Sequence, residues 1–363
     1  MSLFSRGRRA LRTLVLSASV LGLAAGLAAP AEAQGRSDRV RWSVPIAFGS
    51  NLKALGDTLP WVAQQLQQSS DGKIRFEIFE PGKLVPGVEI FDAVSTGKTD
   101  AGYSWMGYEQ GKVPASVLFG AVPFGMEPWE FMAWMYFGGG NELLREVYAP
   151  HRVVPIFCGV ISPEAAGWFR FELTSLDQIK GLKIRAAGLG GRVLQKLGAS
   201  VTVLPGSELF QALEKGVLDA TEFSLPSVDE QLGFYKVAKF YYLPGWHQPY
   251  TAQYLYVKQD AWEGLAPAAR AQIETACTAG VTIALAKSEA LQGETLRRFE
   301  KEGVKAVRLD DEILRALRTA SEEVIAEESA KNELFRKVHE SQQAFIAGYE
   351  NWKQLGYLPR GWK

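Results

Sequence analysis

The chain has few of the residues that bind zinc or form disulfides. Its 363 residues include two cysteines and three histidines, and none of the spacings typical of zinc sites occurs. Cys158 lies in the apolar run VVPIFCGV, and Cys277 lies in a helical run far away in the sequence. In an oxidising compartment the two could pair, but two buried free thiols are the expectation for a chain that builds a large core.

An excess of charge of one sign is also missing. The chain has 40 basic and 40 acidic residues. Its first 33 residues hold four arginines and one glutamate, so the remaining chain carries three more acidic than basic side chains. This balance gives no reason to expect nucleic acid or an anionic membrane surface as a partner.

The sequence contains none of the common catalytic motifs. It has no Gly-x-Ser-x-Gly elbow, no phosphate-binding glycine loop and no dinucleotide fingerprint. The glycine-rich segment 188–191 lacks the spacing and the acidic partner of a nucleotide site. Glu164, Glu222 and His247 could act as acid and base in a lyase or an isomerase, but nothing in their spacing supports this.

Long apolar runs are absent too, since no segment approaches the roughly 20 apolar residues that a membrane-spanning helix needs. A shorter apolar stretch, 14–29, follows four arginines and precedes the small-residue sequence Ala31-Glu32-Ala33. Together these features predict a secretory signal peptide over residues 1–33, cleaved after Ala33. No cysteine stands at the cleavage site to carry a lipid, so the mature chain is expected to be free in the periplasm.

The chain contains one ordered internal repeat. Phe91, Ala93, Gly97, Asp100 and Ala101 recur 119 positions later with the same spacing. In each copy apolar residues at helical spacing end at a glycine, and a short strand follows, so each copy predicts a helix, a tight turn and a strand. Such units are common in α/β proteins, and duplication and chance similarity both stay open. The second copy consists of Phe210, Ala212, Gly216, Asp219 and Ala220.

The repeat predicts an α/β protein with two lobes that face one cleft, mixed sheets and long C-terminal helices. Crossovers near residues 161–167 and 240–250 indicate that the lobes are interwoven. We expect lobe I over residues 34–160 with about 250–280, and lobe II over 161–249. Residues 281–363 are expected to form helices that pack on the lobes and that could form a dimer.

Arg185 is the strongest single candidate for a binding residue. It stands at the end of the apolar strand LKIRAA, and in α/β proteins ligands bind beyond the carboxyl ends of the strands. A guanidinium there can bind a carboxylate through two parallel hydrogen bonds. The alternative is an exposed arginine on a short strand.

Four other polar residues stand near aromatic neighbours at crossovers or strand ends: Glu164, Glu222, His247 and Gln248. Carboxylates with amide or backbone oxygens suit a hard cation such as Na⁺ or Ca²⁺ rather than zinc. Each residue taken alone could equally be a solvated loop residue. Tyr103 and Glu222 follow the two repeat copies at the same distance, so they are expected at equivalent places beside the cleft.

Several segments resemble the solute receptors of tripartite ATP-independent periplasmic (TRAP) transporters, most closely the branch that binds 2-oxo acids and lactate with a metal ion. The resemblance covers nearly the whole mature chain. Its most specific segments are GLKIR and ALEKGVLDATEF. The segments are GKLVPG (82–87), AVPFG (121–125), GWFR (167–170), GLKIR (181–185), ALEKGVLDATEF (212–223) and YYLPGW (241–246).

The resemblance implies that Arg185 binds the ligand carboxylate. It also implies a cation held by Glu164, Glu222, Phe223 and Gln248, where the branch has glutamine at the first position and glutamate at the last. Two carboxylates and one arginine leave a charge of −1, and a monoanionic ligand makes it −2, which buried groups tolerate only with a cation. The full set expected to bind the substrate is Arg185, Glu164, Tyr108, Tyr103, Phe223, Trp246 and His247.

The resemblance further implies a binding protein and not an enzyme. It would capture a small 2-oxo or 2-hydroxy monocarboxylate, such as pyruvate or lactate, with Ca²⁺ or Na⁺. Its partners would be the small and large membrane subunits of a TRAP permease. The residues around Tyr108 and after Trp246 depart from the branch's pattern, so the pocket is expected to differ from that of a pyruvate receptor. A receptor for another organic acid and a ligand sensor are the alternatives.

Overall fold

Three sheets carry the strands of the computed structural model, which describes residues 37–360. The predicted signal peptide and its cleavage site lie outside these residues. Among the described residues, no helix is both long and apolar enough to cross a membrane. The strands are β1 (Val40–Pro45), β2 (Ile74–Phe79), β3 (Ala101–Trp105), β4 (Val153–Ile161), β5 (Gly167–Phe169), β6 (Lys183–Arg185), β7 (Ser200–Thr202), β8 (Ala220–Thr221), β9 (Phe240–Leu243), β10 (Thr251–Lys258) and β11 (Lys305–Arg308).

The sheets are mixed, as the sequence predicts. β1 and β2 pair in parallel. β10 lies between β3 and β4 and is antiparallel to both. The third sheet has the order β11-β9-β5-β8-β6-β7, in which β6 runs parallel to β7 and β8. This parallel group places the carboxyl ends of β6 and β8 at the same edge.

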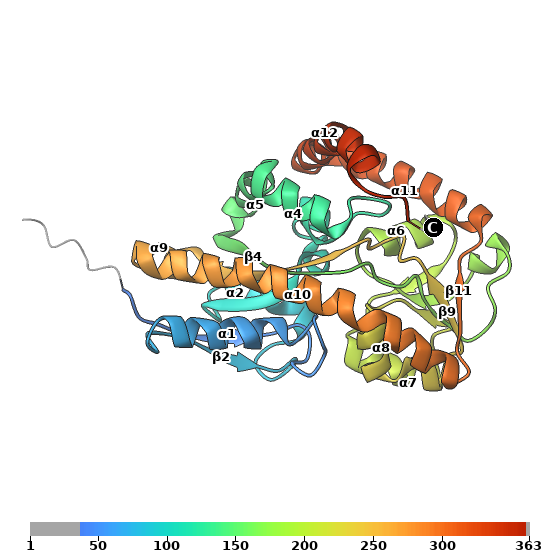
Figure 1. The fold of residues 1–363 in the computed structure, drawn as a ribbon, viewed down its shortest axis with the longest axis horizontal. Helices are drawn as coiled ribbons and strands as arrows, with labels where there is room; N and C mark the ends of the chain where they lie inside the picture. Colours follow the sequence, from blue (N-terminus) through green and yellow to red (C-terminus); the bar gives the residue numbers. More distant parts are fainter. Residues whose placement is uncertain (1–36, 361–363) are drawn as a thin grey trace, which may run out of the picture. The chain divides into compact units, whose positions relative to one another are not determined.

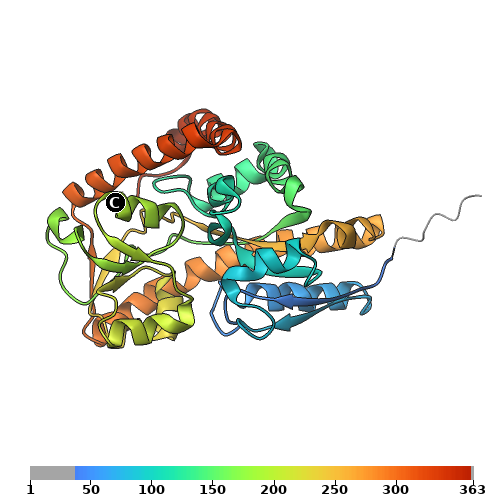
Figure 2. The same ribbon diagram turned by 180° about the vertical axis from the view of Figure 1, so that it is seen from behind.

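Helices cover these sheets, and the longest one contacts two of them. The 35-residue α10 packs on α1, β4, α8 and β11, and Figures 1 and 2 show it from opposite sides. α11 packs against α6, and α12 packs against α3, α4 and α5. The helices are α1 (Thr58–Ser69), α2 (Ile90–Ser95), α3 (Val117–Gly120), α4 (Pro128–Phe137), α5 (Gly140–Tyr148), α6 (Gly188–Lys196), α7 (Gly206–Glu214), α8 (Pro226–Leu232), α9 (Gln259–Glu263), α10 (Pro267–Lys301), α11 (Asp311–Lys331) and α12 (Glu333–Gly356).

Shorter 3₁₀ turns connect several of these elements. Gly139, directly before α5, adopts a left-handed conformation with φ +88°. The segment SLDQIKG contains one of these turns, which begins with a capping box between Ser175 and Gln178. The turns are η1 (Gly87–Glu89), η2 (Met106–Glu109), η3 (Pro114–Ser116), η4 (Ala149–His151), η5 (Leu176–Ile179) and η6 (Phe234–Lys236).

Both copies of the repeat form the predicted helix, turn and strand. Gly97 and Gly216 adopt φ values of +77° and +70°, a left-handed conformation that side chains other than hydrogen disfavour. The predicted equivalence of Tyr103 and Glu222 is wrong, however. β8 ends at Thr221, so Glu222 leaves the sheet, whereas β3 continues to Trp105 and keeps Tyr103 paired with Leu255 inside the sheet.

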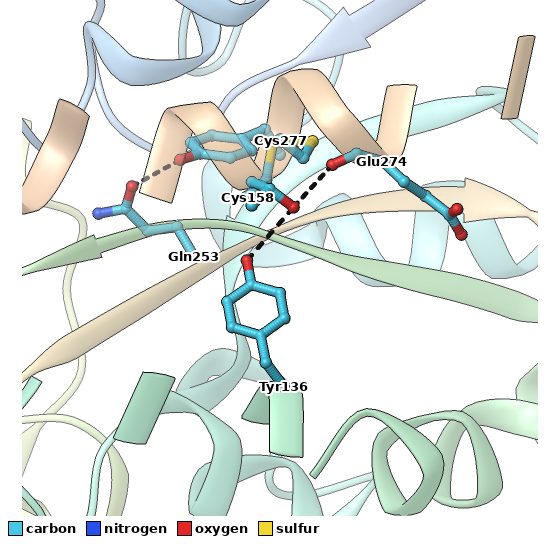
Figure 3. Close-up of a disulfide and its surroundings, with 7 residues drawn as sticks. Tyr136, Cys158, Gln253, Glu274 and Cys277 are labelled. Carbon is cyan, nitrogen blue, oxygen red and sulfur yellow. Dashed lines mark hydrogen bonds between the residues drawn. A yellow bond between two sulfur atoms is a disulfide. The ribbon is translucent and has the colours of Figure 1, made fainter. Parts of the chain in front are cut away.

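The expectation of two free thiols is also wrong. Cys158 of β4 and Cys277 of α10 form a disulfide across 119 residues, with their Cα atoms 4.1 Å apart (Figure 3). The reason is the close packing of α10 on β4. A Cβ added at Gly280 would lie 2.8 Å from the carbonyl oxygen of Cys158, so only glycine allows this approach.

The three-stranded sheet also covers a buried acid. Glu109, at the end of η2, accepts hydrogen bonds from the hydroxyls of Tyr148 and Tyr256 at 2.6 and 2.5 Å. Burial raises the pKa of Glu109 to about 8, despite these two donors. The folded chain therefore keeps this carboxyl protonated at neutral pH. In the unfolded chain the carboxyl has its ordinary pKa of 4.5 and is ionised above that pH.

This difference predicts a pH-dependent stability. Between pH 4.5 and about 8 the folded state binds more protons than the unfolded state, so stability falls as the pH rises, by up to about 1.4 kcal/mol per pH unit. Glu109→Gln should raise the melting temperature at pH 8 and flatten its pH dependence. Calorimetry from pH 5 to 9 measures this, with the exposed Glu77→Gln as the control. An unchanged slope in the Glu109 variant would refute the assignment.

Candidate functional site

Arg185 lies buried at the carboxyl end of β6, with its side chain 3% exposed. Its Nη1 donates to Oε1 and to the backbone oxygen of Glu222, at 2.8 and 2.9 Å. Its Nε donates to the backbone oxygen of Leu204 at 3.2 Å. No hydrogen bond involves its Nη2 within residues 37–360, so the guanidinium is fixed on one side and keeps donors for a ligand on the other.

The register of the parallel strands explains this pairing. Arg185 of β6 stands beside Thr221 of β8, and the backbone amide of Glu222 donates to the backbone oxygen of Arg185 at 3.1 Å. Oε1 of Glu222 also accepts from the backbone amide of Ala187 at 2.8 Å. Two adjacent strand ends thus hold the guanidinium and the carboxylate together.

Two further side chains meet Glu222 from the crossover segments. Nε2 of His247 lies 3.5 Å from Oε2 of Glu222 and 4.0 Å from Oε2 of Glu164. All three side chains are at most 3% exposed, and these three atoms have no hydrogen-bond partner. Three buried donor atoms that point toward one another are an arrangement that can hold a metal ion.

Gln248 and Thr251 position Glu164. The amide nitrogen of Gln248 donates to the hydroxyl of Thr251 at 2.7 Å, and this hydroxyl donates to Oε1 of Glu164 at 2.6 Å. The backbone amide of Glu164 donates to the carbonyl oxygen of Gln248 at 3.1 Å. Oε2 of Glu164 is therefore directed toward Glu222 and His247. The amide oxygen of Gln248 stays available to a ligand.

The glycine-rich segment 188–191 packs against this site and is not a nucleotide loop. A Cβ added at Gly190 would lie 2.7 Å from the Cβ of His247. One added at Gly188, which has φ +62°, would lie 2.9 Å from the ring of Trp105. Small residues here let α6 approach the imidazole and the indole closely.

A cavity of about 10 Å³ lies among these polar groups. Beside it lies a wider cavity of about 270 Å³. Both are lined by Phe48, Tyr108 and Phe223, and the ring of Phe223 lies 5.2 Å from the guanidinium carbon of Arg185. The smaller cavity is lined by Phe48, Leu55, Trp105, Tyr108, Glu164, Arg185, Ala187, Glu222, Phe223, Gln248 and Thr251.

Burial and charge divide the two carboxyl groups. Burial, together with the charge of Glu222, raises the pKa of Glu164 well above its ordinary value. Burial also acts to raise the pKa of Glu222, but Arg185, His247 and the amide of Ala187 outweigh it and hold this pKa below its ordinary value. The two carboxyl groups therefore differ, and Glu222 loses its proton at a lower pH than Glu164.

Three of the residues expected to bind the substrate do not line the small cavity: Tyr103, Trp246 and His247. The hydroxyl of Tyr103 donates to Oε1 of Gln253 at 2.6 Å, inside the core beneath the sheet. Trp246 packs its ring against Phe124, with ring centres 5.9 Å apart, and supports His247 from behind. Tyr103 is therefore a core residue, and the ring of Trp246 packs toward Phe124.

The structure adds site residues that the sequence analysis missed. Phe48, Leu55 and Trp105 are apolar residues indistinguishable from core residues in the sequence. Thr251 is the first residue of β10, directly after the second crossover. A hydroxyl at that strand end was a usable signal for a site residue.

The described residues thus form an α/β fold in which strand ends and crossovers enclose a buried arginine, carboxylates and an imidazole. These features define a binding protein for small solutes. The chain belongs to the DctP family of bacterial extracellular solute-binding proteins, family 7, whose model matches residues 50–332. It is a solute-binding protein of the TRAP type, and such proteins are transport components and not enzymes.

Characterised relatives resemble most of the chain. This chain is 35% identical over 321 residues to a monocarboxylate 2-oxoacid-binding periplasmic protein of Nostoc. The match covers 88% of this chain and 87% of that protein. A TRAP solute-binding protein of Bordetella bronchiseptica, a dimer with calcium and picolinate at its site, is 32% identical with a TM-score of 0.85, covering 87% and 94% of the chains.

A third relative is a TRAP solute-binding protein of Pseudoalteromonas atlantica with bound sodium and pyruvate. It is 32% identical with a TM-score of 0.83, and the match covers 87% of this chain and 96% of that chain. The predicted family and fold class, with mixed sheets and long C-terminal helices, are therefore confirmed. The predicted extracytoplasmic location agrees with the family, whose members work with membrane permease subunits.

Proposed function

We propose that this protein captures a 2-oxo monocarboxylate such as pyruvate, together with a cation, and delivers it to the small and large membrane subunits of a TRAP permease. The observation that carries the proposal is the buried Arg185, which pairs with Glu222 and lines one cavity with Glu222 and Glu164. Oε2 of each of the two glutamates has no hydrogen-bond partner. The free side of the guanidinium suits a carboxylate ligand. Relatives that bind 2-oxo acids and picolinate support the choice of ligand.

The donor atoms also fit a cation. Oε2 of Glu164, Oε2 of Glu222 and Nε2 of His247 lie within 4.8 Å of one another, and the carbonyl of Phe223 and the amide oxygen of Gln248 complete the proposed set. A bound cation would stabilise the ionised form of Glu164 and polarise the 2-oxo group. The ligand's carboxylate adds a further negative charge, so the cation and the ligand should bind cooperatively.

Ligand entry requires an open form of the site. A cavity of about 10 Å³ has room for a single water or ion and is too small for a 2-oxo acid. We place the opening between the two predicted lobes, 34–160 with about 250–280 and 161–249. The wider cavity beside Phe223 offers space for an apolar side chain longer than the methyl group of pyruvate.

Calorimetry on metal-stripped protein tests this function. Pyruvate, longer 2-oxo acids and lactate are titrated with and without Ca²⁺, Na⁺ and a transition-metal ion. We expect binding of at least one 2-oxo acid, weakened at least about tenfold by removal of the cation, since the buried charge is then unbalanced. Ligand recovered unchanged after long incubation would argue against the lyase or isomerase alternative. A failure of every 2-oxo acid to bind would refute the proposal.

We include in the proposal a homodimer formed through the C-terminal helices, which the sequence left open beside helices that pack on their own chain. Several apolar side chains of α4 and of the C-terminal end are exposed, which is unusual for a monomer when they gather on one surface. Sedimentation velocity distinguishes the monomer from the homodimer, and a monomer at all concentrations tested would refute this part of the proposal. The exposed residues are Phe137, Trp352, Leu355, Tyr357 and Leu358.

A further inference from the structure

Nε2 of His247 lies close to Oε2 of Glu164 and of Glu222, although the cation ligands inferred from the family resemblance did not include His247. Its Nε2 is buried, has no hydrogen-bond partner and faces the unpartnered oxygens of Glu164 and Glu222. A buried polar atom without a partner costs free energy. The imidazole therefore points to a group that is bound among these three atoms.

Two glycines allow close packing around the imidazole of His247 and around Glu164. Gly190 of α6 has no side chain where a Cβ would lie 2.7 Å from the Cβ of His247. Gly245 allows the crossover to approach Glu164, since a Cβ there would lie 2.4 Å from the carbonyl oxygen of Glu164. The ring of Trp246 packs edge-on against the imidazole of His247, with ring centres 5.4 Å apart. The position of the ring is thus fixed by its surroundings.

We propose that His247 ligates the cation through Nε2, and that the site selects a first-row transition-metal divalent ion such as Zn²⁺ or Co²⁺ over Ca²⁺ and Na⁺. This inference rests on the proposed function and specifies its ion. Ca²⁺ takes oxygen ligands, whereas imidazole nitrogen favours zinc and its transition-metal neighbours. The charge agrees, because a divalent ion balances two carboxylates, one arginine and one monoanionic ligand, while Na⁺ leaves −1.

The distances support an ion between these groups. Separations of 3.5 and 4.0 Å are longer than a direct hydrogen bond between nitrogen and oxygen. Two donors bound to one zinc or cobalt ion by bonds of about 2.0–2.2 Å lie roughly 3–4 Å apart, so one ion can contact Nε2 of His247 and both carboxylates. The alternative is a protonated imidazole that takes the place of the ion, which would make ligand binding independent of metal.

The test uses the full mature chain, free of any affinity tag and stripped of metal. Zn²⁺, Co²⁺, Ca²⁺ and Na⁺ are each titrated alone, and then with pyruvate. We expect Zn²⁺ and Co²⁺ to bind at least about 100-fold more tightly than Ca²⁺. His247→Gln should remove most of this preference and leave Ca²⁺ affinity within about threefold, while the control His339→Gln should change neither.

A second measurement does not depend on the variant's folding. X-ray absorption of the zinc-loaded wild type should show imidazole scattering, which is retained in His339→Gln. Absence of imidazole from the zinc shell, or a His247→Gln variant with unchanged selectivity, would overturn the proposal. Pyruvate binding undiminished by a chelator would overturn it in favour of the protonated imidazole.

The same data separate this inference from the proposed function. If pyruvate binds equally well with Ca²⁺ and Zn²⁺ and His247→Gln changes nothing, the function stands and the ion assignment fails. If Zn²⁺ binds through imidazole but no 2-oxo acid binds with any ion, the ion assignment stands and the proposed function fails.

Discussion

Arg185→Ala should weaken binding of the 2-oxo acid by about 100-fold or more. The variant removes the guanidinium that would form a buried charge pair with the carboxylate of the ligand. The lost guanidinium also leaves Glu222 buried opposite Glu164, so two carboxylates remain without a positive side chain. Calorimetry with a saturating cation measures the effect. The same change should lower stability by roughly 3–5 kcal/mol, which denaturant unfolding measures separately.

Two control variants separate recognition from folding. Arg185→Lys keeps the charge but loses the planar pair of donors, so we expect an intermediate loss of affinity. Arg192→Ala removes an arginine of α6 that pairs with Glu328 and does not line the small cavity, and it should leave affinity unchanged. If Arg185→Ala is folded by circular dichroism and binds the acid as the wild type does, the assignment of the carboxylate site is wrong.

The local pattern of the sequence put Arg185 and Glu222 each at a strand end, and the family resemblance grouped them in one site. Each follows or ends an apolar strand, and the carboxyl ends of neighbouring parallel strands share an edge. The repeat predicted the same helix, glycine turn and strand twice, and both copies formed. It failed at Tyr103 because the pattern does not show where a strand ends. β8 is two residues long and β3 is five.

Other features depend on contacts between distant segments. The crossover loop at Glu164 meets the loop at His247 through backbone hydrogen bonds from Glu164 to Gln248 and from Gly245 to Glu164. No periodicity encodes that meeting, so the imidazole was grouped with the substrate and not with the cation. The glycines at 188–191 looked like an incomplete motif because the rings of Trp105 and His247, which they accommodate, come from elsewhere in the chain.

The disulfide was missed for the same reason, since 119 residues of separation say nothing about distance in space. Helix propensity places Cys277 in α10 and the apolar run places Cys158 in β4. Only the packing of this helix on this strand brings the two Cα atoms to 4.1 Å. Both cysteines are fully buried, as expected for free thiols as well, so burial did not distinguish the two states.

Removing this disulfide should produce the largest loss of stability among simple variants. A crosslink that closes a loop of 119 residues restricts the unfolded chain by about 5 kcal/mol in the chain-entropy treatment. We expect the Cys158→Ala/Cys277→Ala double variant to unfold at a clearly lower guanidinium concentration than the oxidised wild type. In the presence of a reductant, the unfolding midpoint of the wild type should approach that of the double variant.

The reductant supplies the matched control, since the double variant has no thiol to reduce and its unfolding midpoint should not move. Both sulfur atoms are buried between α10 and β4 (Figure 3), so reduction of the folded protein should be slow and should speed up under unfolding conditions. A double variant within about 1 kcal/mol of the oxidised wild type would show that the crosslink does not limit the unfolded chain. The stability of the α10–β4 contact would then come from side-chain packing alone.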